Sequence, residues 1–153
     1  MKNSKVIISG LKKFYVLEKF QVAYYKSQLS APQDKYYRTA FEKMVEIESG
    51  HVDYFAQKLK ETGTELPEVT SSLFEIASKI LGESVELTGQ YNTCKLGIAL
   101  ENEAIKMYKT LIEEARDQEE LYKALIGNLI DEEFHTFWME NYAKRLNQEK
   151  YKH

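Results

Sequence analysis

The pattern Glu, then Glu-x-x-His, occurs twice in this chain and limits the choice of fold more than any other feature. Its members are Glu18, Glu48 and His51 in the first copy and Glu101, Glu132 and His135 in the second. The chain has only three histidines, so finding both internal ones three residues after a glutamate argues against chance. A Glu from each of two helices, with Glu-x-x-His from each of two more, is the ligand set of dinuclear metal sites inside four-helix bundles. The repeat therefore predicts an all-α bundle with a metal site in its core.

Five helices are expected along the chain. Gly63 and the prolines Pro32 and Pro67 mark breaks between stretches of helical periodicity, and no long run alternates with the two-residue period of a strand. Asp117, with Glu120 three residues later, is typical of a capping box at the start of the last helix. The expected helices are Lys5–Leu29, Pro32–Glu61, Pro67–Leu81, Ser84–Ala115 and Gln118–Asn147.

A length of 153 residues suits one domain with its own core. We expect residues 1–153 to form it from a hairpin over residues 5–61, a crossover helix over 67–81 and a second hairpin over 84–147. The crossover helix has a broad apolar face, which either docks on the bundle or lies at a membrane surface. Docking is favoured because its polar side has few basic residues. The face consists of Leu73, Phe74, Ile76, Ala77, Ile80 and Leu81.

Composition excludes several classes of protein. The net charge of -3 is spread over mixed charges with no basic stripe, which argues against a nucleic-acid partner. The single cysteine, Cys94, excludes an internal disulfide and a Cys-x-x-Cys module, and a buried small hydrophobe is its favoured role. No apolar run is long enough for a signal peptide or a membrane span. We expect a cytoplasmic protein, with peripheral membrane contact and a homodimer left open.

The proposed ligands lie at matching heights within each predicted hairpin. Because a helix rises about 1.5 Å per residue, Glu18 and Glu48 lie at about the same level on either side of the first turn. The same holds for Glu101 and Glu132 around the second turn. Residues three apart project from one helix face, so each Glu-x-x-His run can present both side chains to the core.

Four carboxylates and two imidazoles suit two iron ions, with manganese or zinc as substitutes. Two divalent cations would balance four buried carboxylates, which would otherwise repel one another. By analogy with other such sites, Glu48 and Glu132 are expected to bridge the metals, Glu18 and Glu101 to be terminal ligands, and His51 and His135 to bind one metal each.

Three further residues are candidates for positions next to the ligands. Asp131 is the candidate hydrogen-bond partner of His51, whereas Ile47 stands at the equivalent position of the first copy and leaves His135 without a partner we can name. Tyr25 and Tyr108 each follow the first glutamate of their copy by seven residues. They either contact the ligands or carry a radical, or they are core aromatics with satisfied hydroxyls, and the core role is favoured.

With these residues in place, the chain resembles the ferritin-like di-iron carboxylate superfamily over nearly its whole length. Its spacing is most similar to the demethoxyubiquinone hydroxylase family, which has a long gap filled by an amphipathic helix between the second and third ligand helices. Two departures are Met107, where that family commonly has His, and Leu17, where it commonly has Gly. Rubrerythrins are the second match, but Ala104 stands at the position of their seventh ligand.

The resemblance implies an oxidoreductase that activates oxygen or hydrogen peroxide, with electrons returned by an external donor. If it holds for the hydroxylases, the substrate is a quinone-like ring. Two alternatives stay open: peroxide reduction as in rubrerythrins, and ferroxidase activity with iron handling in a hollow oligomer.

Overall fold

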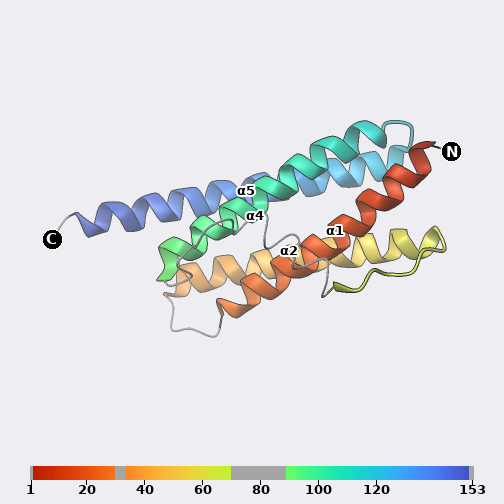
Figure 1. The fold of residues 1–153 in the computed structure, drawn as a ribbon. Coiled ribbons are helices and arrows are strands. Elements are labelled where there is room, and N and C mark those ends of the chain that lie inside the picture. The colour runs from red at the N-terminus through yellow and green to blue at the C-terminus, as the bar shows by residue number, and fades with distance from the viewer. Residues whose placement is uncertain (1, 30–33, 70–88, 152–153) are drawn as a thin grey trace.

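The computed structural model describes residues 2–29, 34–69 and 89–151 (Figure 1). Within that part the chain forms long helices and no strand, so the predicted all-α four-helix bundle is confirmed. The helices are α1 (Lys2–Ser27), α2 (Lys35–Glu61), α4 (Gly89–Glu114) and α5 (Glu119–Lys150). The predicted crossover helix and its apolar face lie outside the described residues from position 70 onward. No helix in the described ranges is long and apolar enough to cross a membrane.

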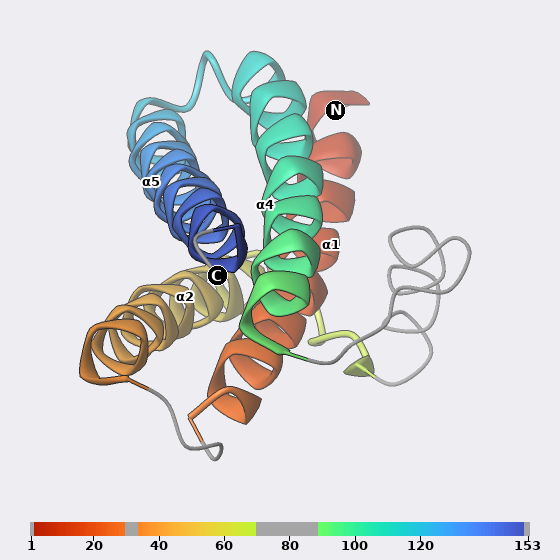
Figure 2. The same ribbon diagram turned by 90° about the vertical axis from the view of Figure 1, so that its left-hand side faces the viewer.

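The four helices are arranged as two antiparallel hairpins that face each other (Figures 1 and 2). Helix α1 packs along α2, and α4 packs along α5. The hairpins meet chiefly where α1 lies against α4, which runs in the opposite direction, whereas α2 and α5 approach each other at few points. This arrangement relates the two copies of the repeat by an approximate two-fold axis through the bundle.

Helix α2 begins at Lys35, three residues after the predicted start at Pro32, because Asp34 caps it. The Asp34 carboxylate accepts a hydrogen bond from the Tyr37 backbone N–H at 2.8 Å, as an N-cap residue does. The helix ends as predicted before Gly63, whose φ of 68° favours glycine. The backbone N–H groups of Gly63 and Thr64 donate to the carbonyls of Lys60 and Leu59, which is the Schellman pattern.

The capping box predicted at Asp117 and Glu120 is wrong. The N-cap of α5 is Gln118, and its side chain makes no capping hydrogen bond. Gln118 N–H donates to the Ala115 carbonyl at 2.8 Å, so the tight turn after α4 uses Asp117 as a turn residue and delays the cap by one position. Other ends also shift: α1 spans Lys2–Ser27, α4 ends at Glu114, and α5 continues to Lys150.

The core consists of two apolar clusters at either end of the bundle, with a polar layer between them. One cluster gathers around Phe14, Phe55 and Leu100. The other gathers around Tyr25, Phe41, Met139 and the buried Cys94, which therefore has the predicted role of a small core residue. Gly97 permits the close approach of α4 to α5, since a Cβ there would lie 2.4 Å from Met139 Sδ. The two clusters keep water from the polar layer.

Candidate metal centre

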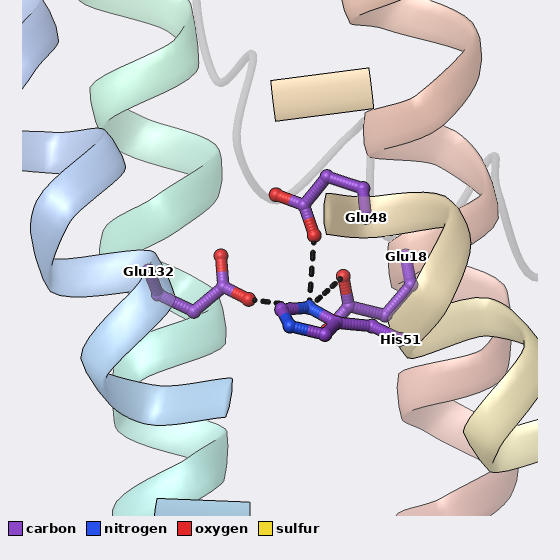
Figure 3. Close-up of side chains that lie close together, drawn as sticks. All are labelled: Glu18, Glu48, His51 and Glu132. Atoms are coloured by element: carbon purple, nitrogen blue, oxygen red, sulfur yellow. Dashed lines mark hydrogen bonds and ion pairs between the residues drawn. The ribbon is translucent and has the colours of Figure 1, made fainter. Parts of the chain in front are cut away.

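All six residues of the repeated pattern meet in the polar layer between the two clusters. The four glutamates are fully buried, and the two histidines are at most 5% exposed. Glu18 comes from α1, Glu48 and His51 from α2, and Glu132 from α5, and their side chains converge in the interior (Figure 3). The other two residues of the pattern are Glu101 of α4 and His135 of α5.

Each imidazole directs Nδ1 at three carboxylates. His51 Nδ1 lies 3.1 Å from Glu48, 3.0 Å from Glu132 and 3.6 Å from Glu18. His135 Nδ1 lies 3.0 Å from Glu48, 3.4 Å from Glu101 and 3.7 Å from Glu132. The distances follow the approximate two-fold symmetry of the hairpins, because Glu48 and Glu132 face both histidines.

The arrangement fits two metal ions. Two groups of four residues each offer ligand atoms that lie within 4.8 Å of one another, and Glu48 and Glu132 belong to both groups. Several of these atoms are buried without a hydrogen-bond partner, including both oxygens of Glu132 and one oxygen of Glu48. Buried polar atoms are rarely left unpaired, so a group of them gathered close together indicates a cation site. Carboxylate oxygens with imidazole nitrogens suit iron.

Without metal, protons compensate the negative charge. Burial, followed by the charges of Glu132 and Glu48, raises the pKa of Glu18 and of Glu101 well above the usual value. Burial alone would lower the pKa of His51 and His135, but hydrogen bonds to the surrounding carboxylates outweigh it and raise both well above the usual value. Because metal ligands must be deprotonated, metal binding at these groups must release the protons.

The two tyrosines predicted beside the ligands bond across the two-fold axis. Tyr25 of α1 donates to Glu101 of α4, and Tyr108 of α4 donates to Glu18 of α1 at 2.5 Å. Both rings are fully buried, so each is a core aromatic whose hydroxyl is satisfied by a proposed ligand. These bonds fix the orientation of the two carboxylates and cross-link the hairpins.

The second half of the site differs from the first in one contact. Asp131 Oδ2 lies 3.0 Å from Nε2 of His51, at the position expected for an orienting carboxylate. His135 Nε2 has no hydrogen-bond partner, and the residue equivalent to Asp131 in the repeat is Ile47. The two histidines therefore have different surroundings on the side away from the carboxylates.

Two polar residues next to the site were not predicted from the sequence. Gln21, fully buried on α1, donates from Nε2 to Glu101 at 3.0 Å. Asn128 on α5 donates to the Tyr108 hydroxyl at 3.3 Å. Gln21 follows Glu18 by three residues on the same helix face, and a polar residue on that apolar face was the available signal.

The sequence profile of the family described as "Ubiquinone biosynthesis protein COQ7" matches residues 18–150. That range contains all six residues of the buried cluster. This chain belongs to the COQ7 family. The resemblance to the demethoxyubiquinone hydroxylases is thereby confirmed, and membership implies a di-iron enzyme of the hydroxylase type. Among curated protein sequences, none matches this COQ7-family chain.

A solved structure agrees with the fold. It is described as "Crystal structure of ferritin like, diiron-carboxylate proteins from Bacillus anthracis str. Ames". The two chains superpose with a TM-score of 0.75 at 20% sequence identity, over 94% of this chain and 99% of that one. The ferritin-like architecture of this COQ7-family chain is therefore confirmed.

Proposed function

We propose that this chain hydroxylates a quinone-like ring with oxygen at two iron ions held by the buried cluster. The observation that carries the proposal is the membership of Glu48 and Glu132 in both groups of candidate ligands. A pair of shared carboxylates between two complete sets is what a dinuclear site requires. The match to the COQ7 family supports the quinone-like substrate.

Each residue of the cluster has a distinct role in this proposal. Glu48 and Glu132 would be shared by the two ions, while Glu18 with His51 and Glu101 with His135 would complete the ligands of one ion each. Iron, when bound, supplies the redox chemistry with oxygen, and an external donor returns the electrons.

The surrounding residues of this chain hold those ligands in place. Asp131 accepts from His51 and keeps Nδ1 of that ring directed at the carboxylates. Tyr25 and Tyr108 hold Glu101 and Glu18 by their hydroxyl protons. The apolar clusters on either side exclude water, which strengthens every charge interaction inside the layer.

The hydroxylase is favoured over a rubrerythrin-like peroxide reductase by the family match and by Ala104. This residue is fully buried on α4 and supplies no carboxylate at the position of the seventh rubrerythrin ligand. Ferroxidase activity with storage would require a large hollow oligomer. The cytoplasmic location, the peripheral membrane contact and the homodimer stay predictions.

The test is a single turnover with isotope-labelled oxygen. Protein loaded with ferrous iron under anaerobic conditions is mixed with a reduced methoxy-benzoquinone and oxygen-18 gas. The mass of the product is then measured by mass spectrometry. The proposal expects one labelled oxygen atom in the product, and none with Glu132→Ala, which deletes a bridge. Consumption of hydrogen peroxide with no labelled product would reject it in favour of the peroxide reductase. A shell-sized oligomer that only oxidises iron would also contradict it.

A further inference from the structure

We infer that an apolar groove between α2 and α5 binds the ring of the organic substrate and places it against His135. The inference rests on the proposed function, because it assigns the substrate site of the same centre. The groove encloses about 410 Å³, which is within the range of about 300–1,000 Å³ for small-molecule pockets. It is lined by Tyr36, Thr39, Ala40, Lys43, Met44 and Ile47 of α2 and by Phe134, His135, Phe137 and Trp138 of α5.

His135 belongs both to the groove and to the buried cluster. Its Nδ1 lies 3.0 Å from Glu48 inside the bundle, while its Nε2 is buried and has no hydrogen-bond partner. The ring is only 4% exposed and lines the groove, so the groove reaches a side chain whose Nε2 the protein itself leaves unsatisfied. A larger cavity of about 510 Å³ between α1 and α4 contains none of the six cluster residues. The α2–α5 groove therefore shares His135 with the proposed metal centre.

The internal repeat provides a comparison within the molecule. Each groove residue has a counterpart in the other hairpin, 84 positions away in sequence, where the same helix face flanks His51. That face is polar: Asp131 replaces Ile47 and bonds His51. The fold alone therefore does not produce an apolar groove, since the same architecture carries polar residues on the other side. The other differences are Glu120 for Tyr36, Lys123 for Thr39, Gly127 for Lys43, Asn128 for Met44, Gly50 for Phe134, Asp53 for Phe137 and Tyr54 for Trp138.

The exposed aromatic side chains of the groove indicate that it binds a ligand. Phe134 is 67% exposed and Phe137 is 65% exposed. Large apolar side chains gathered at the surface mark a binding site. The aromatic rings and the single imidazole fit an uncharged flat ring that carries one oxygen substituent, because the rings stack on its faces and Nε2 can hydrogen-bond the oxygen. The shared His135 favours this small molecule over a membrane surface or a second copy of the chain.

The only tryptophan of the chain, Trp138, reports on this groove directly. The experiment titrates full-length protein, metal-free and zinc-loaded, with a dimethoxy-methyl-benzoquinone that has no prenyl tail, and follows quenching of Trp138 fluorescence. Saturable quenching is expected in both forms. Ala40→Phe fills the groove and should weaken the apparent affinity at least about tenfold. Ala124→Phe is the matched control, because Ala124 is the counterpart of Ala40 in the polar half, and it should leave the affinity unchanged.

A second variant covers the case in which Ala40→Phe fails to fold. Phe134→Ser removes an exposed wall without disturbing the core and should also weaken binding, whereas Glu133→Ser next to it should not. Absence of saturable quenching, or equal weakening by Ala124→Phe, would overturn the inference. The inference would also be overturned if the wild-type protein is a dimer that does not bind the benzoquinone and if Phe134→Ser makes that dimer dissociate. Probe binding in a protein that takes up no iron would support the groove site and reject the hydroxylase.

Discussion

At the residue scale, the main assignment is that Glu48 is shared between two metals. Its two oxygens face the two histidines, and the close contacts with His135 and His51 outweigh burial and lower its pKa well below the usual value. This carboxylate is therefore ionised and available to two cations at neutral pH. The same geometry gives Glu132 the second shared position.

Glu48→Ala should remove metal or halve its content per chain, because it deletes one ligand from both ions. The measurement is elemental analysis by mass spectrometry after loading and desalting. Glu46→Ala, an exposed glutamate on the same helix, is the control and should bind metal as the wild type does. Full retention of metal in Glu48→Ala would disprove the bridging role.

Tyr108→Phe should leave the metal content intact. The hydroxyl donates to Glu18 but is not itself among the candidate ligands, so its loss leaves the donor set complete. Elemental analysis of the variant beside the wild type decides this. Loss of metal would contradict our account, in which this hydrogen bond orients Glu18 but is not required for metal binding.

The sequence was sufficient to predict the six buried residues, because the chemistry of a metal site demands particular residue types at particular spacings. The pairing of Asp131 with His51 could be predicted for the same reason. Gln21 and Asn128 could not, because a polar residue on a buried face gives no sign of which partner it meets. The groove at His135 was also missed, since Phe134 and Phe137 follow no motif and only the structure places them opposite Ala40 and Met44.

At the scale of the element, the helix ends follow from local capping. Asp34 caps α2 and also accepts a hydrogen bond from the Tyr142 hydroxyl of α5 at 2.6 Å, so it joins the two hairpins. The sequence predicted the existence of each described helix from periodicity and placed the start of α5 within one residue, but it assigned the cap to Asp117 instead of Gln118. Asp117 and Glu120 have the spacing of a capping box, whereas the tight turn after Ala115 determines which residue is the cap.

Asp34→Ala should lower the free energy of unfolding by about 1 kcal/mol, the usual cost of losing an N-cap. Urea denaturation followed by circular dichroism measures the change. The matched control is Asp117→Ala, which should change stability by less than about 0.5 kcal/mol because Asp117 caps no helix. Equal losses in both variants would contradict the observed caps.

At the scale of the whole molecule, the buried centre couples metal binding, protons and stability. In the metal-free fold, the raised pKa values of His51 and His135 contribute stability that is fully present below the unfolded value of about 6.5. That contribution is lost as pH rises toward the folded values, because the unfolded chain then binds fewer protons than the folded one. The raised pKa values of Glu18 and Glu101 also make the metal-free fold less stable as pH rises, starting from the unfolded value of about 4.5.

The free energy of unfolding of the metal-free protein should therefore fall between pH 6 and pH 8. The metal-loaded protein should show the opposite slope, since metal displaces these protons and its binding strengthens as pH rises. Urea denaturation at several pH values, with chelator and with metal, provides the comparison. If the free energy of unfolding changes with pH in the same way in the metal-free and metal-loaded proteins, protons are not exchanged for metal at this centre.

The iron content of the whole molecule tests the central claim most directly. The protein is purified anaerobically from iron-supplemented cells, its iron per chain is measured, and its optical spectrum is recorded after oxygen is added. We expect two irons per chain and the spectrum of an oxo-bridged pair, because the cluster offers two ligand sets that share Glu48 and Glu132. Failure to bind iron after repeated loading, or a single iron per chain in the folded wild type, would contradict the dinuclear centre and the enzyme built on it.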